Sequence, residues 1–196
     1  MKNEGYVFAM ICSSNVNRSM AAHDLLRRNN FRVVSYGTGN SVKMPGLVPG
    51  RALTYAFGTE YQKMLDDLNE LGRDYYTKNG MIGMMQRNVV VKKAPQRFQD
   101  EKDLSKIDIC ICFDDRVFDA VLENLQFRAC HGMKPLLVLN MHTQDKPAMA
   151  EEGAHYALRL ATMLNKCQDL EQEACDIKKR FEAETGLCLL FNLFYI

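Results

Sequence analysis

The stretch CSSNVNRS, residues 12–19, contains a cysteine and an arginine in a C-x5-R spacing, with two serines and two asparagines but no carboxylate between them. The apolar run YVFAMI precedes this stretch and the helix-forming segment SMAAHDLL follows it, so we expect a loop that joins a strand to a helix. Backbone N–H groups and the positive end of the helix dipole converge at such a loop. We therefore predict an oxyanion site with a nucleophilic cysteine at its base.

Each residue type in the loop suits phosphoryl transfer. The Cys12 thiol is expected to be held as a thiolate that attacks phosphorus and forms a phosphocysteine. The planar guanidinium of Arg18 can bind two phosphate oxygens at once. Ser19 can hydrogen-bond the sulfur and help it leave, although a serine at this position also suits a helix N-cap. The predicted phosphate-binding residues are Ser13, Ser14, Asn15, Val16, Asn17 and Arg18.

A second C-x5-R match, from Cys110 to Arg116, does not fit the same chemistry. Its Asp114 and Asp115 carboxylates would repel a phosphate, and its apolar residues belong to a strand interior. For the cysteines other than Cys12 we favour a structural role as small buried apolar residues. These are Cys110, Cys112, Cys130, Cys167, Cys175 and Cys188.

A serine alkoxide is a poor leaving group, so the reaction also needs a general acid. Asp145 follows the fourth apolar run, and Asp114 and Asp115 follow the third, so all three would lie at the sheet edge that holds the cysteine loop. Spacing alone leaves the choice among them open. The histidines and cysteines show no metal-ligand spacing, and we expect neither a metal nor a cofactor.

Five short runs of β-branched, aromatic and other apolar residues are predicted strands. They are YVFAMI (6–11), FRVVSY (31–36), IDICICF (107–113), PLLVLNM (135–141) and LCLLFNLF (187–194). Amphipathic helical patterns follow the first, third and fourth runs, and another precedes the last. This alternation favours a three-layer α/β fold with a mostly parallel five-stranded sheet.

The interval of about 70 residues between the second and third runs is much longer than a crossover connection requires. It contains the Gly/Pro-rich stretch KMPGLVPGR and then the helical pattern EYQKMLDDLNEL. We therefore expect one domain over residues 1–196, with a helical insertion over about residues 44–104.

Composition limits the partners that this chain can meet through charge alone. Its 25 basic and 24 acidic residues give a net charge of +1, which argues against direct binding of nucleic acid or of a membrane surface. The seven cysteines include no C-x-x-C pair and favour a reducing compartment. The apolar run at residues 6–11 is too short to cross a membrane.

Beyond the loop, the chain resembles the RNA polymerase II C-terminal-domain (CTD) phosphatases of the cleavage and polyadenylation machinery. The matching stretches are CSSNVNRSMAAH, SYGTGNSVKMPG, YTKNG, QRN, QRFQ, DDRVFD and VLNMHTQD, which cover nearly the whole chain. That family is a distant relative of the low-molecular-weight tyrosine phosphatases. Departures at Ala22, Gln86 and Gln96 remove no catalytic group and indicate a diverged paralogue.

The resemblance implies a low-molecular-weight phosphatase sheet with an insertion, and metal-free hydrolysis of phosphoserine in the heptad Tyr-Ser-Pro-Thr-Ser-Pro-Ser. The fifth and seventh serines are the implied targets, with the phosphoserine–proline bond in cis. The implied partners are the phosphorylated CTD and a symplekin-like scaffold, and the implied location is the nucleus, with a cytoplasmic pool left open.

The resemblance also bears on the choice of general acid. The family's acid segment matches HTQDKPAMAEEGA, which favours Asp145 over its rivals. Asp114 and Asp115 are then interpreted as the cap of the helix that follows them.

A peptide groove built by the insertion is implied as well. Its implied substrate-binding residues are Lys43, Met44, Pro45, Gly46, Tyr76 and Met84. Met84 has an alternative explanation, because methionines at helical spacing commonly fill a core.

Three other functions compete with an active serine phosphatase. One is a weakly active paralogue that binds the phosphorylated tail or symplekin. An arsenate reductase would share the loop, but it needs resolving cysteines that the chain does not evidently supply. A small tyrosine phosphatase would be expected to lack the insertion.

Overall fold

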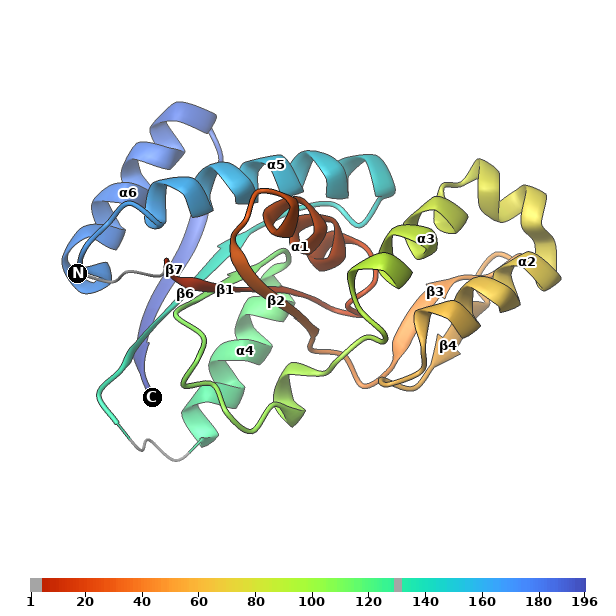
Figure 1. Cartoon of the computed structure of the whole chain (residues 1–196), viewed down its shortest axis with the longest axis horizontal. Helices are drawn as coiled ribbons and strands as arrows, with labels where there is room; N and C mark the ends of the chain where they lie inside the picture. The colour runs from red at the N-terminus through yellow and green to blue at the C-terminus, as the bar shows by residue number, and fades with distance from the viewer. Residues whose placement is uncertain (1–4, 129–131) are drawn as a thin grey trace.

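A five-stranded sheet with the order β2-β1-β5-β6-β7 forms the centre of the protein (Figure 1). The computed structural model describes residues 5–128 and 132–196. The strands are β1 (Val7–Cys12), β2 (Arg32–Gly37), β5 (Ile109–Cys112), β6 (Pro135–Met141) and β7 (Leu189–Tyr195). Neighbouring strands from β2 to β6 are parallel, and β7 pairs antiparallel with β6. The predicted mostly parallel five-stranded sheet is therefore confirmed.

Helices cover both faces of this sheet. They are α1 (Arg18–Arg28), α4 (Asp115–Phe127), α5 (Pro147–Leu164) and α6 (Leu170–Thr185), with a 3-10 turn η1 (Phe98–Asp100). Helices α1, α5 and α6 lie on one face and α4 on the other (Figure 1). Alternate side chains of β1 point into the two cores, Phe8 and Met10 into the first and Ala9 and Ile11 into the second.

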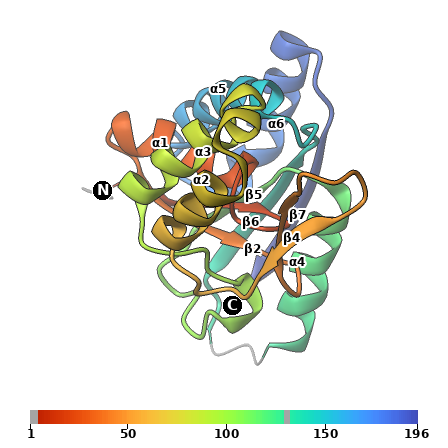
Figure 2. The ribbon, with the colours of Figure 1, turned by 90° about the vertical axis from the view of Figure 1, so that its right-hand side faces the viewer.

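The long interval between β2 and β5 folds into a hairpin and two helices. These are β3 (Val42–Pro45), β4 (Ala52–Tyr55), α2 (Tyr61–Lys78) and α3 (Met81–Val91). They project from one end of the sheet, beside the start of α5 (Figures 1 and 2). The predicted helix in this interval continues past Gly72, where the backbone departs from helical geometry, to Lys78. The hairpin and α3 were not predicted.

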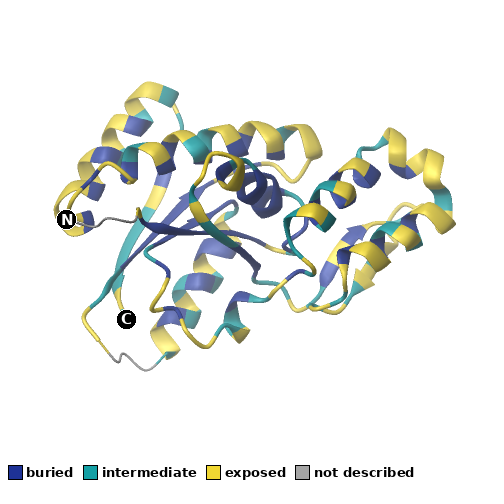
Figure 3. Ribbon diagram, viewed as in Figure 1, coloured by how far each residue is buried: buried dark blue, intermediate teal, exposed yellow. Residues whose placement is uncertain are grey.

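This inserted segment has an apolar core of its own, and that core extends into the main body. Its buried side chains include Tyr61, Met64 and Leu68 of α2, and they pack in one cluster with Val16 of the cysteine loop and Met20 of α1. Figure 3 shows buried residues running from α1 and the central strands into α2 and α3. The insertion is therefore packed directly against the cysteine loop.

The cysteines fit the structural prediction only in part. Cys110, Cys112 and Cys167 are buried, as expected, but Cys175 and Cys188 are exposed, so for these two the prediction was wrong. Cys175 lies on the outer face of α6, and Cys188 lies in the turn before β7. Cys130 lies outside the described residues.

No helix in the described ranges is long and apolar enough to cross a membrane.

Candidate active site

The cysteine loop leaves the carboxyl end of β1 and enters α1. Cys12 is the last residue of β1, and its carbonyl and that of Ser13 accept hydrogen bonds from the N–H groups of Thr38 (3.0 Å) and Gly39 (2.9 Å). A Cβ on Gly37 would lie 2.6 Å from the Ser13 carbonyl oxygen, so this close approach requires glycine. Asn15 takes a left-handed conformation with φ of 54°, which asparagine tolerates better than most residues.

The loop presents a row of unused backbone donors. In residues 5–128 and 132–196, no backbone N–H group of residues 13–18 donates to another group of the chain. Several carbonyls of the same loop do accept hydrogen bonds from outside it. N–H groups arranged in this way form an anion-binding concavity at a helix N-terminus.

Ser19 contacts the proposed nucleophile directly. Its Oγ lies 3.0 Å from the Cys12 Sγ and accepts a hydrogen bond from the Asn15 Nδ2 at 3.0 Å. Because the Asn15 amide already donates to this oxygen, the Ser19 hydroxyl proton is available to the sulfur. The N-cap interpretation of Ser19 is wrong, because α1 begins at Arg18 and its N-cap residue is Asn17.

Arg18 is buried and held along one edge of its guanidinium. Its Nη1 contacts the carbonyl oxygens of Phe113 (3.0 Å) and Thr143 (2.9 Å) and the Asp114 carboxylate (3.1 Å). The buried Nε has no hydrogen-bond partner in the described part of the chain. The Nη2 makes one long contact, 3.5 Å to the Asp145 Oδ2, so the Nε–H and the second Nη2 hydrogen remain available to bind two phosphate oxygens.

The three candidate acids have different surroundings. The Asp145 carboxylate accepts from the Asn17 Nδ2 at 2.9 Å and lies 3.5 Å from the Arg18 Nη2. Asp114 caps α4 by accepting from the Arg116 N–H, as its alternative interpretation predicted, and Asp115 accepts from an Asn140 amide outside the groove. Of the three, only Asp145 lines the cavity above Cys12.

A cavity of about 340 Å³ opens beside Cys12, between the loop, the hairpin, α3 and the start of α5. Its lining residues are Cys12, Ser14, Val16, Asn17, Lys43, Met44, Pro45, Tyr75, Asn79, Met81, Met84, Asp145, Lys146 and Pro147. Lys43, Met44, Pro45 and Met84 are thus brought together as the resemblance implied. Gly46 follows them at the end of β3 and does not line the cavity.

Tyr76 does not occupy the place expected for it. Its side chain is fully buried within the core of the insertion, and the neighbouring Tyr75 lines the cavity instead. Consecutive residues on a helix point in different directions, so only one of the two can face the groove. Tyr75, Asn79, Lys146 and Pro147 were not predicted. Of these four, only Pro147 could have been placed from the sequence: proline favours the first position of a helix, and Pro147 is the first residue of α5.

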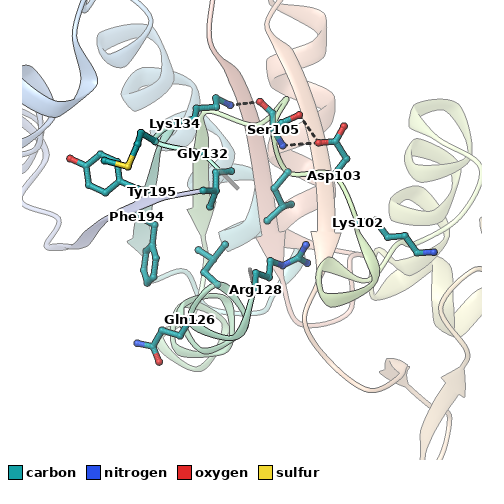
Figure 4. A pocket seen from close by; sticks show the side chains of 13 residues that line it. Lys102, Asp103, Ser105, Gln126, Arg128, Gly132, Lys134, Phe194 and Tyr195 are labelled. Carbon is teal, nitrogen blue, oxygen red and sulfur yellow. Dashed lines mark hydrogen bonds between the residues drawn. The ribbon is translucent and has the colours of Figure 1, made fainter. Parts of the chain in front are cut away.

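A larger cavity of about 720 Å³ lies at the opposite end of the sheet, where β5 and β6 begin (Figure 4). Two of its basic side chains are engaged in hydrogen bonds to the backbone: Arg128 donates to the Phe98 carbonyl and Lys134 to the Ser105 carbonyl. No cysteine in the described ranges lines it. Across the described ranges, no group of three or more His, Cys, Asp or Glu side chains could hold a metal ion. The groove at Cys12 is therefore the candidate active site.

Comparison with known proteins gives consistent matches along the chain. A family model described as "Ssu72-like protein" matches residues 6–196. The human RNA polymerase II C-terminal domain phosphatase SSU72 is 37% identical over 185 residues, which cover 94% of this chain and 94% of that protein. The Caenorhabditis elegans phosphatase ssup-72 is 39% identical over 167 residues, which cover 85% of this chain and 84% of that protein.

Two solved structures from Drosophila melanogaster also match. One is Ssu72 with symplekin, bound to a cis peptidomimetic of the CTD that carries phosphoserine at position five; it has a TM-score of 0.93 and 33% identity and covers 98% of this chain and 100% of that chain. The other is the serine phosphatase of the RNA polymerase II CTD, with a TM-score of 0.93 and 35% identity, covering 97% and 99% of the two chains.

Proposed function

The chain belongs to the Ssu72-like protein family, and from this membership we propose that it is a phosphatase of the RNA polymerase II CTD in which Cys12 is the nucleophile. The observation that carries the proposal is the arrangement around Cys12. Its sulfur lies beside the Ser19 hydroxyl, at the base of a loop whose N–H groups have no acceptor in the described part of the chain. The substrate is a phosphoserine in the heptad repeats.

In the first step the Cys12 thiolate attacks phosphorus in line with the serine oxygen. The S–P bond forms as the P–O bond to serine breaks, which leaves a phosphocysteine. The loop N–H groups and the Nε–Nη2 edge of Arg18 stabilise the three equatorial oxygens. Asp145, beside the cavity and next to Arg18, supplies the proton that the departing serine oxygen takes up. General acid catalysis of this kind contributes about 10²–10⁴-fold in rate.

In the second step a water molecule attacks the phosphocysteine, and Asp145 takes a proton from it. The S–P bond breaks, and inorganic phosphate and the Cys12 thiolate are released. The Ser19 hydroxyl, 3.0 Å from the sulfur, donates a hydrogen bond that stabilises the thiolate as it leaves. None of these steps uses a metal ion, and we propose that the enzyme is metal-independent.

The proposed targets are the fifth and seventh serines of the heptad, with the following proline bond in cis. The Drosophila relative bound to a cis peptidomimetic phosphorylated at the fifth serine supports the fifth position and the cis bond. The apolar part of the groove, formed by Met44, Pro45, Met81 and Met84, suits a proline ring beside the phosphoserine. A substrate on RNA polymerase II supports a nuclear location. The Drosophila complex likewise supports a symplekin-like partner.

The proposal is tested by phosphate release from a heptad-repeat peptide phosphorylated at the fifth position. The protein is kept reduced, the buffer contains a chelator of divalent metals, and Cys12→Ser is assayed in parallel. We expect release by the wild type and none by the variant. A reduced wild type that binds the peptide without releasing phosphate would instead identify a binding module.

A further inference from the structure

We infer that the insertion helps to form the oxyanion site. Three of its side chains hold carbonyl oxygens of the cysteine loop and thereby orient the loop N–H groups toward the oxyanion. These side chains are Tyr61 of α2 and Arg87 and Asn88 of α3, which we call the carbonyl clamp. The inference deepens the proposed function and rests on its oxyanion loop, but not on the CTD as substrate.

The sheet can hold only the first part of the loop. The carbonyls of Cys12 and Ser13 accept from backbone N–H groups just after β2, which continue the pairing between β1 and β2. Beyond Ser13, no backbone N–H group of a described strand donates to the carbonyl of Asn15 or Val16. In the described structure, donors from the insertion reach them instead.

Tyr61 holds the first of these carbonyls. Its hydroxyl donates to the Asn15 carbonyl oxygen at 2.5 Å, and its side chain is fully buried. Burial raises the pKa of Tyr61 well above its ordinary value, so the hydroxyl keeps its proton and remains a donor.

Asn88 and Arg87 hold the next two carbonyls. The fully buried Asn88 donates its Nδ2 to the Val16 carbonyl at 2.8 Å. The Arg87 Nη2 contacts the carbonyl oxygens of Val16 (3.2 Å) and Asn17 (3.4 Å). The Asn88 Oδ1 accepts from the Arg87 Nε at 3.2 Å, which fixes the orientation of the Asn88 amide.

Peptide planarity transmits this hold to the anion site. In a trans peptide the carbonyl of one residue and the N–H of the next point in opposite directions. The Asn17 carbonyl also accepts the first backbone hydrogen bond of α1, from the Ala21 N–H at 2.9 Å, so the insertion does not hold it alone. Fixing the Asn15 and Val16 carbonyls on the insertion side therefore aims the N–H groups of Val16 and Asn17 at the other side. These are among the N–H groups that have no acceptor within the described chain. Val16 and Met20 also pack in the insertion core, which holds the cysteine loop and the insertion in a fixed relative position.

The inference separates two roles that the insertion could have. If the insertion only shapes the peptide groove, its loss affects peptides and spares small phosphate esters that do not reach the groove. If the carbonyl clamp orients the loop, its loss weakens the binding of every oxyanion, including inorganic vanadate. It also disfavours the Cys12 thiolate.

The test uses Tyr61→Phe, which removes one hydroxyl and keeps the ring, and the isosteric Asn88→Asp, which replaces a donor by an acceptor. The measurements are the inhibition constant of vanadate, kcat and KM on a small aryl phosphate, and the pH profile of Cys12 alkylation. The control is Tyr6→Phe, which removes another buried tyrosine hydroxyl, bonded to the Cys167 carbonyl at the far end of β1. Thermal unfolding of each variant checks that it is folded.

We expect vanadate to bind about 10-fold more weakly to Tyr61→Phe and more weakly still to Asn88→Asp, because a buried acceptor is left unpaired or repelled. The small-ester kcat should fall and Cys12 alkylation should shift to higher pH, while Tyr6→Phe matches the wild type. Wild-type vanadate binding and a wild-type alkylation profile in folded Tyr61→Phe would overturn the inference, even if Asn88→Asp does not fold. Suppose that the clamp variants bind vanadate more weakly but the wild type releases no phosphate from the heptad phosphopeptide. That result would uphold this inference and refute the proposed function.

Discussion

The carboxylate of Asp145 and the hydroxyl of Ser19 serve different steps of the proposed reaction. Asp145 lines the groove and contacts Arg18, whereas the Ser19 Oγ lies 3.0 Å from the Cys12 sulfur. We therefore assign proton transfer to the departing serine oxygen to Asp145 and stabilisation of the departing sulfur to Ser19.

Asp145→Asn should therefore slow the enzyme in a way that depends on the leaving group. We expect kcat on a phosphoserine peptide to fall by about 10²–10⁴-fold, because an alkoxide cannot leave without a proton. The loss in the first step should be smaller for an aryl phosphate with an acidic leaving group. Burst kinetics on both substrates measure this step.

The matched control is Asp115→Asn, which changes a carboxylate at the same sheet edge that bonds the Asn140 amide. It should keep kcat within about threefold of the wild type. Equal losses for the serine and aryl esters in Asp145→Asn would remove Asp145 from the role of acid.

His23 predicts a dependence of stability on pH. The ring is buried, and its Nδ1 lies 2.8 Å from the Ser35 Oγ. Burial lowers the pKa of His23 from 6.5 to about 4; the charges of Lys92 and Arg27 add to this shift, and that of Asp24 opposes it. The unfolded chain therefore binds a proton near pH 6.5 that the folded protein accepts only near pH 4. The resulting stability is present above pH 6.5 and is lost as the pH falls toward 4, by up to roughly 3 kcal/mol.

Urea unfolding of wild type and His23→Asn at pH 7.0 and pH 4.5 measures this effect. The wild type should lose more stability than the variant on acidification, because asparagine does not titrate. The difference between the two proteins isolates His23 from carboxylates that titrate in the same range. A difference in free energy that stays constant with pH would contradict the account.

At the scale of elements, the β3–β4 hairpin forms one wall of the groove. Gly46 ends this wall beside β4, and a Cβ added there would overlap the Arg51 carbonyl oxygen. Gly46→Ala must therefore displace the hairpin, which carries Lys43, Met44 and Pro45. We expect KM for the heptad peptide to rise about 10-fold and KM for a small aryl phosphate to rise much less. Equal rises for both substrates would mean that the hairpin acts on the loop and not on the peptide.

The sheet could be predicted because its strands are buried on both faces and appear as continuous apolar runs, as in IDICICF. The hairpin was missed because its strands have only four residues each and lie among glycines and prolines. Helix α3 was not predicted, and only Met84 of its methionines was assigned to the groove. In the structure Met84 both packs in the insertion core and lines the cavity, whereas Met85 is fully buried in that core. Tertiary packing decides between these uses, and local sequence does not record it.

At the scale of the whole molecule, one arginine joins the ends of three strands. Arg18 bonds the Phe113 carbonyl after β5 and the Thr143 carbonyl after β6, and it follows the loop from β1. The parallel order of these strands brings their carboxyl ends to one edge, which is why residues over 100 positions apart meet at the site. The sequence predicted this meeting from topology. Spacing left the choice among Asp114, Asp115 and Asp145 open, because that choice depends on where loops turn, and only the family resemblance favoured Asp145.

Arg18→Lys tests this convergence. A lysine keeps the charge but cannot span the carbonyls and present a planar edge to phosphate at the same time. We expect kcat/KM on both peptide and aryl substrates to fall on the order of 10²-fold or more, since loss of one oxyanion donor has about this effect. Thermal unfolding should also shift downward. Near-wild-type kcat/KM would show that Arg18 only supports the fold.

Detection of the phosphocysteine intermediate would establish whether Cys12 is the nucleophile. Ser19→Ala should slow breakdown of the intermediate, so we would mix this variant with the heptad phosphopeptide, quench within milliseconds and map the protein by mass spectrometry. We expect one added phosphoryl group on Cys12, which appears with peptide dephosphorylation and decays with phosphate release. Dephosphorylation that proceeds at the full rate with Cys12 unmodified, or that survives in Cys12→Ser, would contradict it.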